Sequence, residues 1–390
     1  MKICILTGRF GMGHMIAAQA IEEQIKDNRR DVEVEIIDWF EHITPKLADR
    51  GYKLFGLFVS KGYRFYNTRY RLMENRRIDQ KPELFSYFKW NFKKFMEEKK
   101  PDILISTLPI CSQLVSQYKE RTGSSIPLIT CVTDITGHSE WINKNTDFYL
   151  VGSDSVKEKF TMKGVSADKI YETGIPVRSG FTKKAPNKNE NRFHNKKILI
   201  MGGGLGMLPA DNGFYSDIDI IPSVEVTIIT GKNVNLYHQL IGKYRNFNVL
   251  GYVNNVYDYM IQADIIITKP GGVTTFEAIF AGVPILALNP FLQQEIYNAQ
   301  YIQEMSIGTV INAKDKKCSQ KIADALEKEQ LNMYRCNIQR IKSNLNINVL
   351  NCLLDESLQT SNRKEKVGLP ISYDHIVEEN EIHEKISFNI

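Results

Sequence analysis

The chain has 390 residues, of which 43% are hydrophobic and 24% are charged. This composition is typical of a globular protein and excludes a disordered chain, and the length suffices for two domains with separate cores. The formal net charge of +5 is modest.

Six cysteines are scattered along the chain without a Cys-x-x-Cys pair or neighbouring histidines: Cys4, Cys111, Cys131, Cys318, Cys336 and Cys352. This usage favours a reduced cytosolic compartment and argues against a zinc site or a disulfide framework. The chain starts directly with a predicted strand at 2–7 and a glycine loop, so we expect no secretory signal. No stretch approaches the roughly 18 apolar residues that a transmembrane helix needs. We therefore expect a cytoplasmic protein.

The first half of the chain alternates predicted strands and helices, which indicates a doubly wound α/β domain with a parallel sheet. Strands are predicted at 2–7, 32–38, 103–106, 128–132 and 148–151, and helices at 14–27 and from Cys111. In open sheets of this kind, ligands bind at the carboxyl ends of the strands.

The first strand is followed by Gly11-Met-Gly13-His14, with His14 at the start of the first helix. Glycines at this place let a substrate approach the main chain. The positive end of the helix disfavours an imidazolium, so His14 is a candidate general base at neutral pH. A capping or surface histidine is the alternative interpretation.

An insertion at about residues 50–100 has 14 Lys/Arg against 5 Asp/Glu, which gives +9 there and −4 for the rest of the chain. It also contains 13 aromatic residues. Basic residues interleaved with aromatics suit nucleic acid or an anionic membrane surface. The helical spacing of Phe55 and Phe58 favours the membrane, and we expect no nucleic-acid partner. The alternative is a basic solvated face over an aromatic core.

A loop with Asp134, His138 and Trp141 follows the predicted strand at 128–132. Asp134 could polarise His14 or position an acceptor, and Trp141 could supply a face for a sugar or an acyl chain. The alternative is a loop held by its own turn hydrogen bonds, with Trp141 in the core.

A polar segment at 183–197, with one proline and almost no aliphatic residues, is typical of a linker. We therefore predict an N-terminal domain at 1–182 and a C-terminal domain at 198–358. The pattern ends after Leu358, and we expect a weakly ordered tail at 359–390. The two doubly wound domains are expected to face each other across a cleft.

The second domain begins with a strand at 197–201 and a glycine loop at 202–206. No convincing ribose-binding acid follows about 20 residues later, so a dinucleotide site is weakly indicated there. Lys232 ends the next strand and could neutralise a phosphate. Asp217 and Asp219 lie away from the other candidates, and we expect neither a metal site nor a cofactor.

The most informative segment is Ile267 to Leu286, which contains a strand end, the Pro270-Gly-Gly turn and a helix opened by Thr274 and Thr275. Free N–H groups of a helix start, reached through glycines, bind phosphate or pyrophosphate. Glu277, one turn into the helix, is placed to accept hydrogen bonds from two ribose hydroxyls. A polar loop at 289–298 ends the next strand, so the sequence predicts a nucleotide-sugar site.

Five motifs in the same order, within about residues 2–345, resemble those of the glycosyltransferases related to monogalactosyldiacylglycerol synthase and the peptidoglycan N-acetylglucosaminyltransferase. They are Thr7–His14, Thr133-Asp134 with His138 and Trp141, Gly174–Phe181, Gly202–Gly206 and Lys269–Asn298. The chain is also similar to the bacterial processive diacylglycerol β-glucosyltransferases. Those enzymes usually have Gly-Gln-Glu where this chain has Gln293-Gln294-Glu295, so the resemblance leaves the sugar open.

The resemblance implies the GT-B architecture of two Rossmann-like domains. It implies His14 as the base, supported by Asp134, and an acceptor site formed by Phe10, Gly11, Gly13, His138 and Trp141. The implied UDP-sugar site comprises Gly203, Gly204, Thr230, Gly231, Lys232, Tyr252, Val253, Lys269, Gly271, Gly272, Val273, Thr274, Glu277, Gln294 and Glu295.

The resemblance further implies an inverting, metal-independent transfer of glucose or galactose from a UDP-sugar to diacylglycerol, in glycolipid synthesis on the inner face of the cell membrane. One alternative is transfer to a polyprenyl-linked or small-molecule acceptor, or epimerisation of the sugar. Another is a catalytically idle nucleotide-sugar sensor, against which the presence of both His14 and Asp134 argues.

Overall fold

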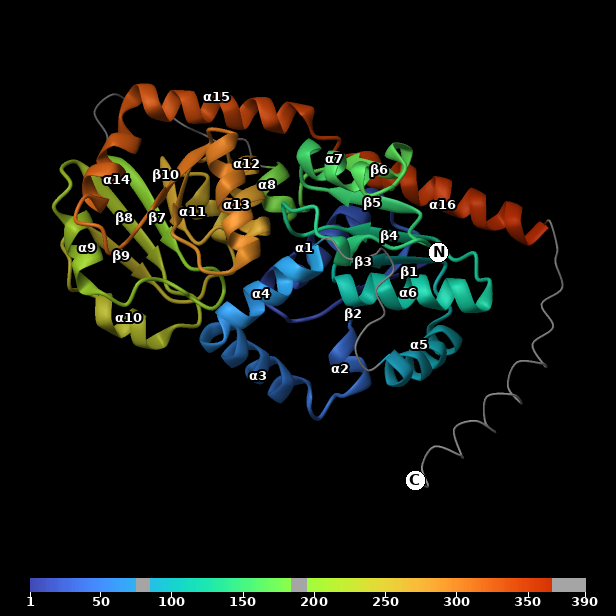
Figure 1. The fold of residues 1–390 in the computed structure, drawn as a ribbon. Helices are drawn as coiled ribbons and strands as arrows, with labels where there is room; N and C mark the ends of the chain where they lie inside the picture. The colour runs from blue at the N-terminus through green and yellow to red at the C-terminus, as the bar shows by residue number, and fades with distance from the viewer. Residues whose placement is uncertain (75–84, 184–194, 367–390) are drawn as a thin grey trace.

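The computed structural model describes residues 1–74, 85–183 and 195–366. It contains two parallel six-stranded sheets, each flanked by helices (Figure 1). The predicted doubly wound α/β fold with two domains is therefore confirmed. The predicted linker falls mostly on 184–194, which lie outside the described residues, as do 75–84 of the basic insertion and 367–390 of the predicted tail.

The N-terminal sheet has the strand order β2-β1-β3-β4-β5-β6. Its strands are β1 Lys2–Thr7, β2 Glu33–Asp38, β3 Ile103–Ser106, β4 Leu128–Cys131, β5 Phe148–Val151 and β6 Ile170–Glu172. The order reverses between β1 and β3, so the loops after these two strands lie side by side at the edge where ligands bind. Helix α1, Met12–Asn28, and helix α6, Pro109–Thr122, begin in those loops.

Four helices occupy the insertion between β2 and β3: α2 Trp39–Ile43, α3 Ala48–Lys61, α4 Tyr63–Glu74 and α5 Phe85–Lys99. Phe88, Phe92 and Phe95 of α5 are buried in one cluster with Trp39. The aromatic-core interpretation therefore applies to α5. Helices α3 and α4 differ, because Leu54, Leu57, Phe58, Phe65 and Leu72 are exposed on them.

The C-terminal sheet has the order β12-β11-β10-β7-β8-β9. Its strands are β7 Lys196–Met201, β8 Val224–Ile229, β9 Phe247–Leu250, β10 Ile265–Thr268, β11 Ile285–Leu288 and β12 Gly308–Ile311. The helices are α9 Asn212–Asp219, α10 Val234–Leu240, α11 Val256–Met260, α12 Gly272–Ala281, α13 Gln293–Glu304, α14 Cys318–Leu326 and α15 Lys328–Asn344. Here the order reverses between β7 and β10, which brings the 202–206 loop beside the Pro270 turn.

The last helix, α16 Val349–Lys366, crosses back to the N-terminal domain (Figure 1). Leu350, Leu353 and Leu354 are buried in one cluster with Ile3 and Ile103 of the N-terminal sheet. The predicted C-terminal domain at 198–358 included the first part of this helix. Amphipathic spacing does not reveal which sheet a helix covers, so the sequence could not show that α16 packs on the N-terminal sheet. The helix also continues to Lys366, into the segment expected to be weakly ordered.

Helix α12 joins the two domains into one packed unit. Phe276 is fully buried and would contact Cβ atoms placed at Gly152 and Gly174 of the N-terminal domain. One apolar cluster contains residues of both sheets, including Val151 of β5, Leu199 of β7 and Ile266 of β10. No helix in the described ranges is long and apolar enough to cross a bilayer.

Candidate active site

His14 lies in the first turn of α1, where the strand order of the N-terminal sheet reverses. Its Nδ1 is 2.8 Å from the Thr107 carbonyl oxygen and 2.9 Å from Thr133 Oγ1. A carbonyl oxygen only accepts hydrogen bonds, so Nδ1 carries the proton in the neutral ring. The lone pair is then on Nε2, which is the nitrogen available to act as a base.

Burial lowers the pKa of His14, while the Asp134 carboxylate and the hydrogen bond to Thr107 oppose that change. The ring is therefore neutral at pH 7. Asp134 acts on His14 through charge, whereas the orienting hydrogen bond comes from Thr107. Burial in turn raises the pKa of Asp134, and the proximity of His14 opposes the rise.

The lowered pKa of His14 predicts the pH dependence of the reaction. A base works only when deprotonated, so activity should be present above this pKa and be lost as pH falls through it. We expect the acidic limb of a kcat/KM profile to lie below pH 6.5, the ordinary histidine value. Nearby Glu140, whose pKa burial raises to about 8, stays protonated across that limb. A limb above pH 7 that persists in Glu140→Gln would contradict this assignment.

The other predicted acceptor residues differ in burial and in the residues that they contact. Trp141 is fully buried, with its ring centroid 6.2 Å from that of His14. Its indole N–H lies close enough to Asp134 to lower the pKa of that carboxyl, although Nε1 has no hydrogen-bond partner of good geometry among the described residues. Phe10 packs edge-on against Phe55 of α3, with ring centroids 4.9 Å apart. This contact connects the loop between β1 and α1 to the insertion.

His138 is 1% exposed, and the protein uses both of its ring nitrogens. Nε2 is 2.9 Å from the Tyr70 carbonyl oxygen, and Nδ1 accepts a hydrogen bond from the Glu140 amide at 3.3 Å. The ring also stacks on Tyr70 with centroids 4.0 Å apart. This arrangement gives His138 the position of a residue that holds α4 against the loop, rather than one that faces an acceptor.

The glycine turn before α12 contacts the loop after β4 directly. A Cβ at Gly272 would overlap the Thr133 carbonyl oxygen, so only glycine permits this approach of the two domains. Gly13 in α1 faces Val273, with 3.7 Å between a Cβ placed on Gly13 and the valine methyl group. The first turns of α1 and α12 thus lie against each other. Gly271 is the N-cap of α12, and Thr274 is half-buried in its first turn.

Glu277 is 3% exposed and lies one turn inside α12. Its Oε1 is 3.2 Å from Nη2 of Arg178, and burial raises the pKa of the carboxyl against the effect of this arginine. Nη1 of Arg178 donates to the Asn254 carbonyl oxygen at 3.0 Å, next to Tyr252 and Val253. Arg178 thus orders the predicted ribose and base positions together. It lies in the Gly174–Phe181 motif but was missing from the predicted site residues.

The segment that follows β11 contributes a second group of charges. Lys269 Nζ forms an ion pair of 2.6 Å with Glu295 Oε1, and Glu295 is buried. Asn298 is also buried, and its amide donates to the Pro270 carbonyl oxygen at 3.0 Å while it accepts from the Ile135 amide at 3.1 Å. Asn298 therefore ties the glycine turn to the residue after Asp134.

The loop after β7 packs closely against the turn that follows β8. Gly231 has φ of +57°, and a Cβ there would lie 2.7 Å from the Gly204 carbonyl oxygen. A Cβ at Gly203 would lie 3.9 Å from Lys269, which places this loop beside the Pro270 turn. Thr230 is buried, and its hydroxyl donates to the Leu250 carbonyl oxygen. Lys232 is exposed, with Nζ 6.0 Å from the ring centroid of Tyr252.

Helix α4 supplies contacts that the sequence did not predict. Asn67 donates from Nδ2 to the Phe291 carbonyl oxygen at 2.7 Å and accepts from the Gln293 amide at 2.9 Å. The Tyr66 hydroxyl donates to Gln294 Oε1 at 2.8 Å, and the Tyr297 hydroxyl donates to Glu74 at 2.7 Å. Composition revealed only a basic aromatic insertion here, and no local pattern marks a contact over more than two hundred residues.

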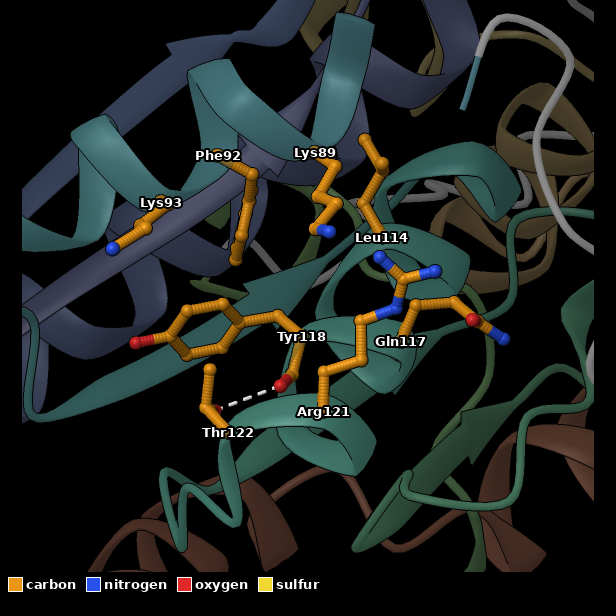
Figure 2. A pocket seen from close by; sticks show the side chains of 8 residues that line it. All are labelled: Lys89, Phe92, Lys93, Leu114, Gln117, Tyr118, Arg121 and Thr122. Carbon is orange, nitrogen blue, oxygen red and sulfur yellow. Dashed lines mark hydrogen bonds between the residues drawn. The ribbon is translucent and has the colours of Figure 1, made fainter. Parts of the chain in front are cut away.

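A small pocket lies between α5 and α6 (Figure 2). Phe92, Leu114 and Tyr118 line it, together with the aliphatic parts of Lys89 and Arg121. None of the predicted site residues lines it.

Comparisons with known proteins cover both domains. The family described as monogalactosyldiacylglycerol (MGDG) synthase matches residues 14–177, and the glycosyltransferase family 28 C-terminal domain matches residues 197–348. A processive diacylglycerol beta-glucosyltransferase of Bacillus thuringiensis is 32% identical over 320 residues, which cover 80% of this chain and 82% of that protein. A protein of the same description from Bacillus cereus has the same identity and coverage.

Solved structures show the same architecture. The crystal structure of Acinetobacter baumannii MurG has a TM-score of 0.61 at 13% identity and covers 92% of this chain and 99% of its own. Anabaena Alr3699/HepE, solved in complex with UDP, has a TM-score of 0.52 at 14% identity, with 92% of this chain and all of its own covered. At these identities the likeness shows the fold, which is the predicted GT-B arrangement.

Proposed function

Because the chain belongs to the glycosyltransferase family of monogalactosyldiacylglycerol synthase and the processive diacylglycerol glucosyltransferases, we propose that it transfers glucose or galactose from a UDP-sugar to diacylglycerol. The observation that supports this most is the contact between the first turns of α1 and α12. It supports a reaction in which His14, in the first turn of α1, acts as the base on a sugar whose diphosphate is bound at the start of α12.

The proposed reaction is an inverting displacement. Nε2 of His14 takes the proton of the acceptor hydroxyl, and the hydroxyl oxygen forms a bond to the anomeric carbon of the sugar. The bond between that carbon and the β-phosphate oxygen breaks, and UDP leaves with the electron pair. Amides at the start of α12 and in the 203–206 loop stabilise the leaving charge, with Lys269 and Lys232 nearby, so the proposal needs no metal ion.

Release of UDP from a panel of UDP-sugars, measured with and without diacylglycerol, tests this proposal. We expect release from UDP-glucose or UDP-galactose that depends on diacylglycerol. If UDP is released only with a polyprenyl-linked lipid or a water-soluble acceptor, that compound and not diacylglycerol is the acceptor. Tight UDP-sugar binding without release under any of these conditions would favour a sensor.

We also propose that α3 and α4 contact an anionic membrane. Leu54 and Leu57 of α3 and Phe65 and Leu72 of α4 are all more than half exposed. Arg64 and Arg71 are exposed on α4 among them. Apolar side chains can enter the headgroup region while arginines remain at the phosphates. Arg76 and Arg77, which belong to the same basic insertion, lie outside the described residues.

Vesicle sedimentation should show binding that rises with anionic lipid content and falls with salt. Each basic residue near such a surface contributes about 1 kcal/mol, so Lys53, Arg64 and Arg71 replaced together by Gln should weaken partitioning by about 100-fold. Activity on a detergent-dispersed acceptor should persist. Lys314, Lys316 and Lys317, exposed in the C-terminal domain, provide a charge-matched control. Equal loss of binding in both variants would show a general charge effect only.

A further inference from the structure

One contact at the donor site comes from the opposite domain. Tyr66 belongs to α4 of the N-terminal insertion, yet its hydroxyl donates to Gln294 Oε1 at 2.8 Å, in the first turn of α13. Gln294 is half-buried beside Glu295, which pairs with Lys269. The phenol therefore reaches the residues that, on the proposed function, face the transferred sugar.

The direction of this hydrogen bond determines what Gln294 can present. Tyr66 donates its hydroxyl proton to Gln294 Oε1. Burial raises the pKa of Tyr66, and the charges of Glu140, Asp134 and Glu295 raise it further, so this proton stays on the phenol. A primary amide has one oxygen that accepts and one nitrogen that donates two hydrogens. The hydrogen bond from Tyr66 to Oε1 fixes the orientation of the amide, so its nitrogen presents two N–H donors in a fixed direction.

The position of Tyr66 is itself fixed from three sides. The neighbouring Asn67 makes two hydrogen bonds to the backbone of residues 291 and 293. One turn later, Tyr70 stacks on His138 and is 3.2 Å from Thr136 Oγ1. At the end of α4, Glu74 accepts the Tyr297 hydroxyl at 2.7 Å. Helix α4 therefore cannot rotate without breaking contacts to both domains.

We propose that Tyr66 is a positioning residue that orients the Gln294 amide toward the donor sugar and so sets the preference between hexoses. This inference rests on the proposed function. Glucose and galactose differ only in the direction of the hydroxyl at C4. A site that holds a hydrogen-bond donor in one direction distinguishes two such hydroxyls, whereas a freely rotating amide serves both.

The test is Tyr66→Phe, which removes the hydroxyl and keeps the ring. We expect the ratio of kcat/KM for UDP-glucose and UDP-galactose to move toward one by about 3- to 10-fold, the equivalent of one neutral hydrogen bond. The change should appear in KM for the sugar nucleotide, while kcat at saturation and the affinity for UDP itself stay within about twofold, since UDP lacks the hexose.

Tyr297→Phe is the matched control, because it also removes one hydroxyl hydrogen bond between α4 and α13 without touching Gln294. It should keep the wild-type ratio. The inference is overturned if the ratio changes equally in both variants, or if it does not change in Tyr66→Phe. It is also overturned if the wild type uses both hexoses equally. All three outcomes leave the proposed function intact. If the wild type uses no UDP-hexose, the proposed function itself fails, and the inference fails with it.

Discussion

Replacement of His14 by alanine should lower kcat by at least about 100-fold, the scale for loss of a general base. The expected loss depends on one atom, Nε2 of His14. The Thr107 carbonyl oxygen holds the proton on Nδ1, and burial keeps the ring neutral, so Nε2 carries a lone pair at pH 7. Alanine removes that lone pair, and water does not occupy the same fixed position.

The affinity for UDP should change little in this variant, because His14 belongs to the opposite domain from the predicted nucleotide residues. His14→Gln, which keeps hydrogen-bonding capacity without a useful base, should be equally slow. His238→Ala provides a matched control, since that histidine is exposed on α10. Turnover at the wild-type rate in His14→Ala, measured as UDP release at saturating substrates, would exclude His14 as the base.

The sequence predicted those features that depend on local pattern. The apolar run at 265–267, the Pro270 turn and the helix after it are contiguous, so a helix start suited to phosphate can be recognised without knowledge of the rest of the fold. The same holds for His14, which lies at the start of the helix after the first strand and follows Gly11 and Gly13.

Other features depend on packing between distant segments and could not be predicted. Helix α16 has an amphipathic pattern that fits either domain, and only burial of Leu350 and Leu353 against Ile3 shows which one it covers. Arg178 lay in a recognised motif, but its role became visible through its contacts to Glu277 and Asn254. Likewise, Trp141 and His138 were recognised as a pair of loop residues, whereas their burial was a property of the whole domain.

Replacement of Glu277 by alanine should weaken UDP binding by about 1.5–3 kcal/mol, which corresponds to about 10- to 150-fold in Kd. Glu277 is buried one turn into α12, and Arg178 occupies only its Oε1 in the described contacts. Oε2 is thus the oxygen we expect to accept a ribose hydroxyl. Glu277→Gln keeps the size of the side chain but loses the charge, so it should bind UDP with intermediate affinity.

Calorimetry with UDP and with its 2′,3′-dideoxy analogue separates loss of the ribose contact from damage to the helix. The wild type should bind the analogue more weakly than UDP, whereas Glu277→Ala should bind the two ligands about equally, because the partner of the hydroxyls is already gone. Arg178→Gln leaves the carboxylate in place and should therefore still distinguish the two ligands. If Glu277→Ala retains the full preference for UDP over the analogue, the ribose is bound elsewhere, and the effect of the substitution arises from the buried Arg178 contact alone.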